Sequence, residues 1–371
     1  MNVEGKRIKV LFAIGRMSVG GAEKLLVYQL RTLSSAFDPR VITLFPEQKD
    51  SLANDVRIDK CFRFRSAFDI FALAHLYLYL RRERFDAVVT SLFSANLLVR
   101  ITAILARVPV IISYEHNIYP QKHRWQIFMD RFLARFTDLI ITDSEAARVF
   151  TARQERIPLE KFKTMYISPL LEGTPKDART VRRELGVPEN ATVVLTVSRL
   201  IGDKGHRYLI DAAREVLSAQ KNVYFVIVGW GPEGGPLKEQ IARYGVGDKV
   251  KLPGRMDIRD VLPISDIYVD PAVSTDLPIA VMEAMREKRA IVATNIAEIP
   301  VFIEHNVTGL LVEPKDVSGL SRALTTLLSD ATLRTRLGEA ASRRVEKFSL
   351  KEYMREFEKL IVDLYDARAK N

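Results

Sequence analysis

The segment that most constrains the fold of this chain runs from residue 270 to 294, DPAVSTDLPIAVMEAMREKRAIVAT. An apolar run typical of a buried strand, ISDIYVDPA, leads into it, and a polar loop follows. Pro278 then opens a segment with apolar residues at helical spacing, because its fixed φ suits the first helical turn. A second apolar run, AIVAT, closes the segment. This order predicts a βαβ unit, whose loop and helix N-terminus lie at the ligand-binding carboxyl edge of a parallel sheet.

The start of this predicted helix has the features of a binding site. Backbone N–H groups of a first helical turn carry about half a positive charge in aggregate, so they favour an anion or a sugar hydroxyl. Glu283 follows Pro278 by about one and a half turns. Its carboxylate is expected to reach the same ligand from the side.

A related pattern occupies residues 191–217, ATVVLTVSRLIGDKGHRYLIDAAREVL. It predicts a strand, a loop and a helix, with Arg199 and Lys204 on either side of a glycine-containing turn. Arginine offers a planar fork of donors and lysine a mobile point charge, and together they suit a pyrophosphate. The alternative is a pair of surface charges at the end of a strand.

The first half of the chain alternates apolar runs with helical segments, which is typical of an α/β domain. Its first run leads into a loop with Gly20 and Gly21, which serve either a tight turn alone or a close approach of the backbone to a ligand. His116 ends another run at the ligand-binding edge, and is either a structural or a functional residue. Asp143 and Ser144 are expected to cap the helix that follows them.

Positive charge is concentrated in the first half. Residues 1–170 carry 26 Lys and Arg against 17 Asp and Glu, and the whole chain has a formal net charge of +10. A basic half can face nucleic acid, an anionic membrane surface or an anionic substrate, or it can be solvated without a partner. No nucleic-acid-binding motif is recognisable, which disfavours the first partner.

Two predicted helices in this half, at 68–85 and 122–136, combine basic and aromatic residues. The second spaces four aromatic residues at three or four positions, with four cations among them: Trp125, Phe128, Phe132 and Phe136, and Lys122, Arg124, Arg131 and Arg135. Either the aromatic residues are core and the charges solvated, or one face lies on an anionic membrane. The second interpretation would bring this half to a lipid-linked acceptor.

Several classes of protein are disfavoured by composition. No window has the eighteen or so uncharged apolar residues that cross a bilayer, and the first apolar run is too short for a signal peptide. Cys61 is the one cysteine, so a disulfide framework and a Cys-rich metal site are excluded. We expect a cytoplasmic protein, peripheral at the cytoplasmic face of the membrane if the basic aromatic helix binds lipid.

Three motifs together resemble the retaining GT-B glycosyltransferases of family 4. They are LPIAVMEAM from Leu277, the Arg-Leu…Lys-Gly pattern at Arg199 and Lys204, and the Gly-Gly-Ala-Glu of the first loop. The chain departs from the family at several positions. Thr275 and Asp276 replace a Glu and a Gly, and Ser198 and Lys288 each replace a Gly. Ala297, Glu298 and Val301 stand where the family would have a Gly-Gly-x-Pro-Glu turn.

The resemblance implies an α/β protein with two Rossmann-like domains facing across a cleft. The expected acceptor-binding domain is 1–170, the nucleotide-sugar-binding domain is 171–348, and a helix at 349–371 returns to the first domain. The Pro- and Gly-rich stretch 168–190 is the expected linker.

The resemblance also implies roles for individual residues. Arg199 and Lys204 would stabilise the leaving diphosphate, Glu283 would accept the ribose hydroxyls, and His116 would lie close to the donor sugar. The backbone of Leu277, Pro278 and Ile279 would hold that sugar, and the backbone of Arg255 and Met256 would meet the base. Gly20 and Gly21 would lie near the donor phosphates and the acceptor. Asp276 is the candidate stand-in for the carboxylate that Thr275 lacks.

The implied activity is transfer of a sugar, with retention of configuration, from a donor such as a UDP- or GDP-sugar to a lipid-linked glycan or polysaccharide. No cofactor and no metal are expected, since no Asp-x-Asp motif is present. The rival hypothesis is a catalytically silent nucleotide-sugar-binding subunit. A sugar epimerase is disfavoured because the motifs match transferases.

Overall fold

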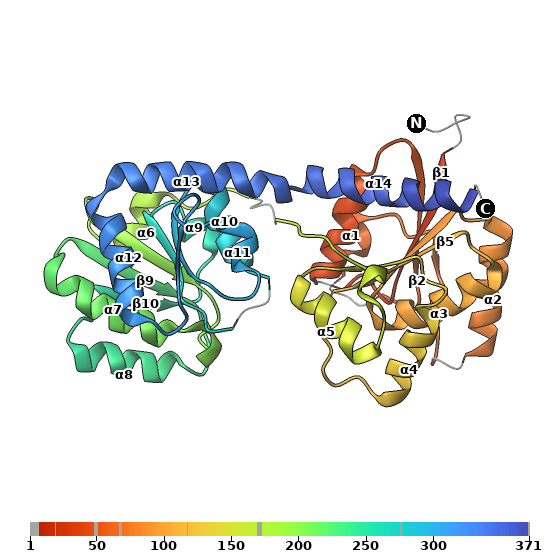
Figure 1. The fold of residues 1–371 in the computed structure, drawn as a ribbon, viewed down its shortest axis with the longest axis horizontal. Coiled ribbons are helices and arrows are strands. Elements are labelled where there is room, and N and C mark those ends of the chain that lie inside the picture. The colour runs from red at the N-terminus through yellow and green to blue at the C-terminus, as the bar shows by residue number, and fades with distance from the viewer. Residues whose placement is uncertain are drawn as a thin grey trace. The chain divides into compact units, whose positions relative to one another are not determined.

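The computed structural model describes residues 7–18, 20–47, 51–66, 69–116, 118–168, 173–274 and 277–369. They form two compact units, each built on its own parallel sheet (Figure 1). Unit 1 comprises Met1–Ile167 and Leu350–Asn371, and unit 2 comprises Ser168–Ser349. None of the helices in the described ranges is both long and apolar enough to cross a bilayer.

Unit 1 has a seven-stranded sheet in the order β3-β2-β1-β4-β5-β6-β7, with all neighbours parallel. Its strands are β1 (Ile8–Ile14), β2 (Phe37–Thr43), β3 (Lys60–Cys61), β4 (Ala87–Ser91), β5 (Val110–Glu115), β6 (Leu139–Thr142) and β7 (Phe162–Thr164). Its helices are α1 (Gly21–Thr32), α2 (Ile70–Glu83), α3 (Leu92–Ala106), α4 (Arg124–Leu133), α5 (Glu145–Glu155) and α14 (Leu350–Ala369).

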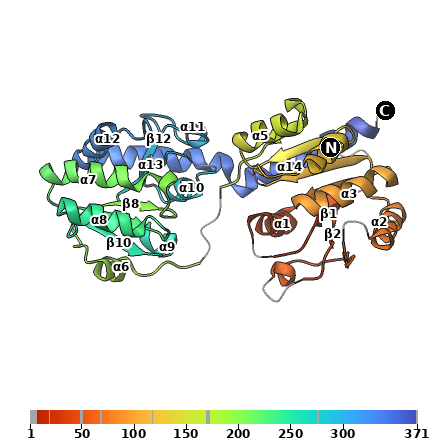
Figure 2. The same ribbon diagram turned by 90° about the horizontal axis from the view of Figure 1, so that it is seen from below.

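Alternating side chains of these strands build two cores, one on each face of the sheet. Val10, Phe12 and Ile14 pack with α1 and with α14, while Leu11 and Ala13 pack with α2 and α3. Helices α2 and α3 lie side by side (Figures 1 and 2). The sheet is therefore covered on both faces, as a parallel sheet requires.

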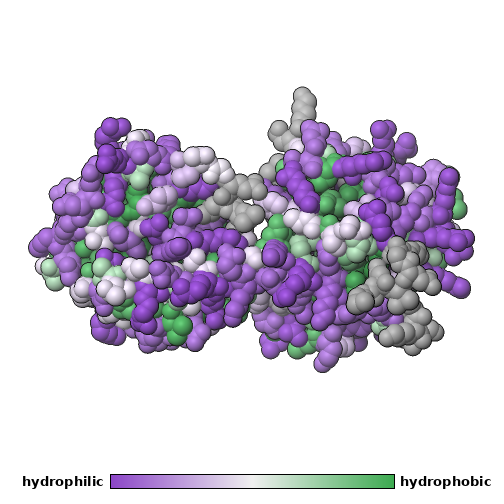
Figure 3. All heavy atoms as spheres, turned by 90° about the horizontal axis from the view of Figure 1, so that it is seen from above, coloured by the Kyte–Doolittle hydropathy of each residue, from purple (hydrophilic) through white to green (hydrophobic). Residues whose placement is uncertain are grey.

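Helix α14 returns the C-terminal segment to unit 1, as the resemblance implied. Its buried residues Tyr353, Met354, Phe357 and Ile361 recur at helical spacing. Seen from the side of unit 1 on which α14 lies, its surface is mostly hydrophilic, with hydrophobic residues in small patches (Figure 3). The apolar stripe of α14 thus faces the core of unit 1.

Unit 2 has a six-stranded parallel sheet in the order β10-β9-β8-β11-β12-β13. Its strands are β8 (Thr192–Val197), β9 (Val223–Val228), β10 (Val250–Gly254), β11 (Ile267–Asp270), β12 (Ala290–Thr294) and β13 (Leu310–Val312). Its helices are α6 (Ala178–Leu185), α7 (His206–Ala219), α8 (Gly234–Tyr244), α9 (Ile258–Val261), α10 (Ile279–Arg286), α11 (Ile299–Phe302), α12 (Val317–Ser329) and α13 (Ala331–Val345).

The predicted linker is not wholly irregular, because it contains helix α6. Asp177 caps this helix by accepting a hydrogen bond from the amide of Thr180, and Gly186 ends it in a left-handed conformation. Val181 and Leu185, one turn apart, are buried. The segment is rich in charge and proline, yet these two side chains are enough to fix one amphipathic helix on unit 2.

Candidate functional site

The order of strands in unit 2 reverses between β8 and β11. From β8 the chain proceeds to β9 and β10 on one side, whereas β11, β12 and β13 extend the sheet on the other. A parallel sheet binds ligands outside the carboxyl ends of its strands at such a reversal. The loop after β8 carries Arg199 and Lys204, and the loop after β11 leads to α10, so the sequence-predicted residues flank this point.

Backbone hydrogen bonds join these two loops. The carbonyl oxygen of Asp203 accepts from the amides of Val273 and Ser274, at 2.8 and 3.3 Å. Gly205 makes the close approach possible, since its φ is +65° and a Cβ there would lie 1.9 Å from the carbonyl oxygen of Pro271. The position of Lys204 is therefore fixed against the loop that precedes α10.

The charge of Lys204 acts directly on the end of β11. Burial raises the pKa of Asp270, and the nearby Lys204 ammonium opposes that rise. Burial raises the pKa of Tyr268 well above its ordinary value, and the charges of Asp270 and Glu283 add to the rise. A cation and two carboxyl groups thus share the carboxyl edge of β11.

Helix α10 begins as predicted, with Pro278 buried at its N-cap and Ile279 exposed. No side chain in the described part of the chain caps this end. The amide of Ile279 donates to the carbonyl oxygen of Leu277, and the helical ladder starts with Met282 donating to Pro278. The intervening amides of the first turn have no acceptor among the described residues, and such amides can bind a ligand. Thr275 and Asp276 lie outside the described residues.

Glu283 is half-buried on α10. Burial, with a smaller contribution from the charge of Asp257, raises the pKa of Glu283 to about 7. Among the described residues, no hydrogen bond or ion pair engages its carboxyl group. A carboxyl group held in this way is typical of a binding or catalytic position.

Arg199 is exposed, and its guanidinium group has no acceptor within the described ranges. The preceding residue, Ser198, contacts the first residue of α7, since its Oγ lies 2.9 Å from Nε2 of His206. His206 is 2% exposed, and burial with the charge of Lys204 lowers its pKa to about 4. Sequence reasoning missed this pair, although a serine in place of the family's glycine was a visible signal.

The loop after β10 brings Arg255 and Met256 beside the same edge. These two residues line a hollow of about 420 Å³ with Lys176, Glu184, Asp257 and Asp260. The effect of Asp257 on the pKa of Glu283 places this loop near α10. The structure thus gathers the predicted base-binding loop, the cationic loop and Glu283 within unit 2.

The glycine loop of unit 1 follows β1, where the strand order of that sheet reverses between β1 and β4. Gly20 is the N-cap of α1 with extended backbone, and a Cβ on it would lie 2.5 Å from a carboxylate oxygen of Glu23. A Cβ on Gly21 would meet nothing within 4 Å. Gly20 therefore makes room for Glu23, whereas Gly21 faces open space.

His116 lies at the carboxyl end of β5, as predicted. Its Nδ1 atom is 3.0 Å from Oδ2 of Asp143, and its ring stacks on Tyr114. Its Nε2 atom is buried without a partner in the described residues. Asp143 orients this histidine, while Ser144 caps α5 by accepting from the amide of Ala147. Ser144 therefore caps the helix as expected, whereas Asp143 contacts His116 instead.

Lys122 was expected to be an exposed charge of the basic aromatic helix, but its side chain is buried. Its side chain is 6% exposed and donates to Asp130 at 2.9 Å and to Glu155 at 2.5 Å. Arg100 pairs with Asp130 in the same buried cluster, and Glu115 lies 3.9 Å from Lys122. Lys122 is thus an internal anchor for the loop before α4.

The aromatic residues of α4 and its C-terminal end are exposed, so the interpretation that they form core is wrong. Trp125 is 53% exposed and Phe128 is 66% exposed, and Phe132 and Phe136 are also exposed. The buried face of α4 instead carries Asp130 and Leu133. Exposed aromatic residues grouped in this way are typical of an interaction surface.

Comparison with known proteins agrees with this architecture. Two parallel-sheet α/β units, each with a strand-order reversal, define a two-domain Rossmann-like fold of the GT-B class. Residues 177–344 match the family described as glycosyl transferases group 1, and residues 19–166 match the Glycosyltransferase Family 4 domain. The two matches take in most of the chain, which belongs to the group 1 glycosyltransferases and is an enzyme of the hexosyltransferase type.

Similar proteins include an alpha-D-kanosaminyltransferase of Streptomyces kanamyceticus, 28% identical over 66% of this chain and 67% of that protein. A UDP-Gal:alpha-D-GlcNAc-diphosphoundecaprenol alpha-1,3-galactosyltransferase of Escherichia coli is 25% identical over 80% of each chain. Among solved structures, Anabaena Alr3699/HepE in complex with UDP has a TM-score of 0.76 at 22% identity, covering 96% of this chain and 100% of that one. A Rickettsia africae glycosyltransferase has a TM-score of 0.78 at 18% identity, covering 97% and 99%.

Proposed function

We propose that this protein transfers a sugar from a nucleotide-sugar donor to an acceptor, with retention of configuration and without a metal ion. The observation that carries the proposal is the carboxyl edge of the unit 2 sheet. There the loop with Arg199 and Lys204 is hydrogen-bonded to the loop before α10, and Glu283 lies on that helix with its carboxyl group unengaged in the described residues. UDP in the structural relative and the UDP-sugar named for the E. coli relative support a UDP-sugar donor.

In the proposed reaction, the bond between the sugar and the diphosphate breaks as the acceptor oxygen bonds to the anomeric carbon, and the proton of the acceptor hydroxyl passes to the leaving diphosphate. Negative charge then develops on the leaving diphosphate. Arg199, Lys204 and the first-turn amides of α10 stabilise that charge, and loss of one such preorganised donor typically costs on the order of a hundred- to a thousandfold in rate. Glu283 accepts the ribose hydroxyls. Leu277 to Ile279 hold the sugar, and the backbone of Arg255 and Met256 meets the base. In unit 1, His116 is the candidate sugar-binding residue.

For the acceptor we propose a lipid-linked glycan or polysaccharide bound by unit 1. A hollow of about 420 Å³ lies in the loop after His116 and is lined by Phe93, Ile118, Tyr119, Pro120, Gln121, Lys122, His123 and Gln126. It combines aromatic faces with amide groups, which suits a sugar ring. Because Lys122 is anchored to Asp130 and Glu155, this wall of the hollow is preorganised.

The exposed aromatic row of α4 supports a peripheral contact with an anionic membrane. Trp125, Phe128 and Phe132 share one face of α4 and Phe136 follows its end, and Arg124, Arg131 and Arg135 are their neighbours in the sequence. Binding by such helices scales with apolar area and with attraction to acidic lipids. Co-sedimentation with anionic vesicles at low salt should pellet the wild type and leave a Trp125→Ser/Phe128→Ser variant in solution. A wild type that stays in solution excludes the contact.

A donor screen tests the transfer itself. Nucleotide sugars that bind should raise the melting temperature, since ligand binding stabilises the folded state, and one of them should be hydrolysed or transferred. Glu283→Ala should weaken nucleotide binding, whereas Asp276→Ala should lower turnover more than binding. Equal activity of wild type and Asp276→Ala would eliminate Asp276 as the stand-in carboxylate.

The second candidate is a catalytically silent nucleotide-sugar-binding subunit of a glycosylation complex. The observation that favours it is Thr275, where the family has a glutamate. Binding of a nucleoside diphosphate without turnover across the whole donor panel would support this candidate over the transferase.

A further inference from the structure

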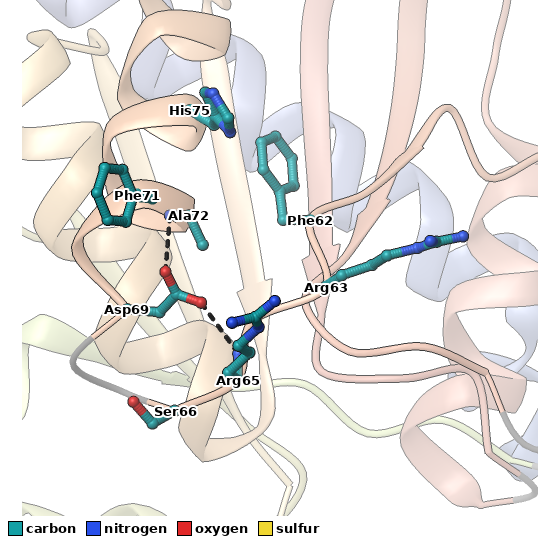
Figure 4. Close-up of a pocket in the computed structure, with 8 residues that line it drawn as sticks. All are labelled: Phe62, Arg63, Arg65, Ser66, Asp69, Phe71, Ala72 and His75. Atoms are coloured by element: carbon teal, nitrogen blue, oxygen red, sulfur yellow. Dashed lines mark hydrogen bonds between the residues drawn. The ribbon is translucent and has the colours of Figure 1, made fainter.

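A second hollow in unit 1 lies apart from the residues discussed so far. It follows the edge strand β3 at the carboxyl edge of the sheet and borders the first turns of α2 (Figure 4). Its volume of about 490 Å³ is in the range of small-molecule sites. The lining residues are Phe62, Arg63, Arg65, Ser66, Asp69, Phe71, Ala72 and His75. In Figure 4 the side chains of Phe62, Phe71 and His75 surround a space that Arg65 and Asp69 close from the other side.

The carboxylate of Asp69, which lines this hollow, already accepts hydrogen bonds from backbone amides. The two carboxylate oxygens of Asp69 accept from the amides of Ala72 and Arg65, at 3.1 and 3.2 Å, and so cap α2. These hydrogen bonds hold the pKa of Asp69 below its usual range. The carboxylate therefore stays charged and oriented by backbone, with the helix N-terminus occupied by a residue of the chain itself.

The cationic side chains, in contrast, have no acceptor among the residues that the structure describes. Within the described ranges, neither the guanidinium groups of Arg63 and Arg65 nor the ring of His75 has a hydrogen-bond or ion-pair partner. Arg63 has a φ of +52° and extends away from the hollow, whereas Arg65 lies at its floor (Figure 4). The lining thus has an excess of donors that an anion would satisfy.

The apolar part of the hollow continues along α2. Phe71 is 84% exposed, and Phe71, His75, Leu78 and Arg82 are spaced by four, three and four residues, so they form one stripe. Ile70 and Leu78 are also exposed, whereas Phe62 is buried as the rear wall. An exposed phenyl ring and a guanidinium without a hydrogen-bond or ion-pair partner in the described residues line the same hollow, which suits a ligand with both an anionic and an apolar part.

We propose that this hollow binds a phosphate group carried on an apolar chain, with Arg65 on the phosphate and Phe71 against the chain. In the reaction above, which this assignment presupposes, the ligand is the phosphate-bearing part of a lipid-linked acceptor. Arg63 contributes positive potential at the rim, which favours encounter with the anion.

Calorimetry with soluble probes tests the binding site without any glycosyl transfer. Hexyl phosphate should bind the wild type, and Arg65→Ala should weaken it by about tenfold or more, since a hydrogen bond to a charged group is lost. Phe71→Ala should weaken hexyl phosphate and leave inorganic phosphate unchanged. Arg322→Ala, which removes an exposed arginine from unit 2, is the matched control and should bind like the wild type. Equal binding by Arg65→Ala and wild type would overturn the proposal.

Two further experiments decide whether the ligand of this hollow is a lipid-linked acceptor or a bulk membrane lipid. With a diphosphate-linked lipid acceptor, Arg65→Ala should raise KM for the acceptor, while donor hydrolysis and transfer to an alkyl glycoside without phosphate stay unchanged. An Arg65→Ala variant that loses affinity for phosphatidylglycerol vesicles but uses the diphosphate acceptor normally would overturn the acceptor assignment. If the wild type transfers no sugar at all, the proposed function fails, whereas the calorimetric result still decides whether the hollow binds phosphate.

Discussion

The Oγ atom of Ser198 lies 2.9 Å from Nε2 of His206, and this contact ties the end of β8 to the first residue of α7. His206 stays neutral at pH 7 because burial and Lys204 lower its pKa to about 4. The pair therefore fixes the cationic loop without adding charge to it. The serine that departs from the family's glycine is accommodated by this contact.

The first prediction concerns acid stability. The imidazole of His206 binds a proton with a pKa near 6.5 in the unfolded chain and about 4 in the folded chain. The unfolded state thus binds more protons as the pH falls from 6.5 to 4, and stability is lost in that window. At pH 5 the loss is about 2 kcal/mol. Denaturant titrations at pH 7 and pH 5 should show this loss in the wild type and a smaller one in His206→Gln.

A second prediction concerns Glu283, whose pKa is raised rather than lowered, so that its effect on stability depends on pH in the opposite sense to that of His206. The pKa of Glu283 is raised to about 7 in the folded chain, so its contribution to stability is present below pH 4.5 and is lost as the pH rises through 7. Only the ionised form is a full acceptor for ribose hydroxyls. The affinity for a nucleotide sugar should therefore rise about tenfold from pH 6 to pH 8. Glu283→Gln should bind weakly at both values, and an equal slope in this variant would contradict the assignment.

The third prediction concerns two positions where the family has glycine. Lys288 and Ala297 have φ values of +56° and +44°, so the backbone still adopts the left-handed conformation that glycine favours. A non-glycine residue there costs about 1 kcal/mol. Lys288→Gly and Ala297→Gly should each stabilise unit 2 by roughly that amount in urea unfolding. Lys288→Ala keeps the Cβ atom and should give no such gain.

The fold could be predicted largely from the sequence because its strands and helices have strong periodic patterns. The apolar runs before Pro278 and before Arg199 became β11 and β8, at the strand-order reversal of unit 2. Helix α6 was missed because only two apolar residues define it. The aromatic residues of α4 were ambiguous, since periodicity shows that residues share a face but not whether the face is buried.

A fourth prediction tests the return of the C-terminal helix. The hydroxyl of Tyr353 accepts from Nε2 of Gln29 at 3.0 Å and lies 3.0 Å from the hydroxyl of Tyr114. Phe357, one turn later, is fully buried. Phe357→Ala should destabilise unit 1 by about 3–5 kcal/mol through the cavity it leaves. Tyr353→Phe should cost about 1–2 kcal/mol through the lost hydrogen bonds. Unchanged stability of both variants would contradict the packing of α14.

The candidate site could be predicted only in part. The motifs pointed to Arg199, Lys204 and Glu283, because charged residues at a strand end or helix start have a direct chemical meaning. Asp270 and His206 could not be found in this way, since their importance comes from burial and from the charge of Lys204. Lys122 was assigned to the surface because periodicity does not reveal its burial, and its partner Glu155 is 33 residues away in the sequence.

Binding of UDP to variants of the cationic loop is the most direct test of the proposed donor site. Isothermal titration calorimetry should show UDP binding to the wild type and to the control variant Arg322→Ala. Arg199→Ala and Lys204→Ala should each bind UDP about tenfold or more weakly, because each loses a charge-assisted hydrogen bond to the diphosphate. Wild-type affinity for UDP in both variants would contradict the account, because the diphosphate would then be held elsewhere.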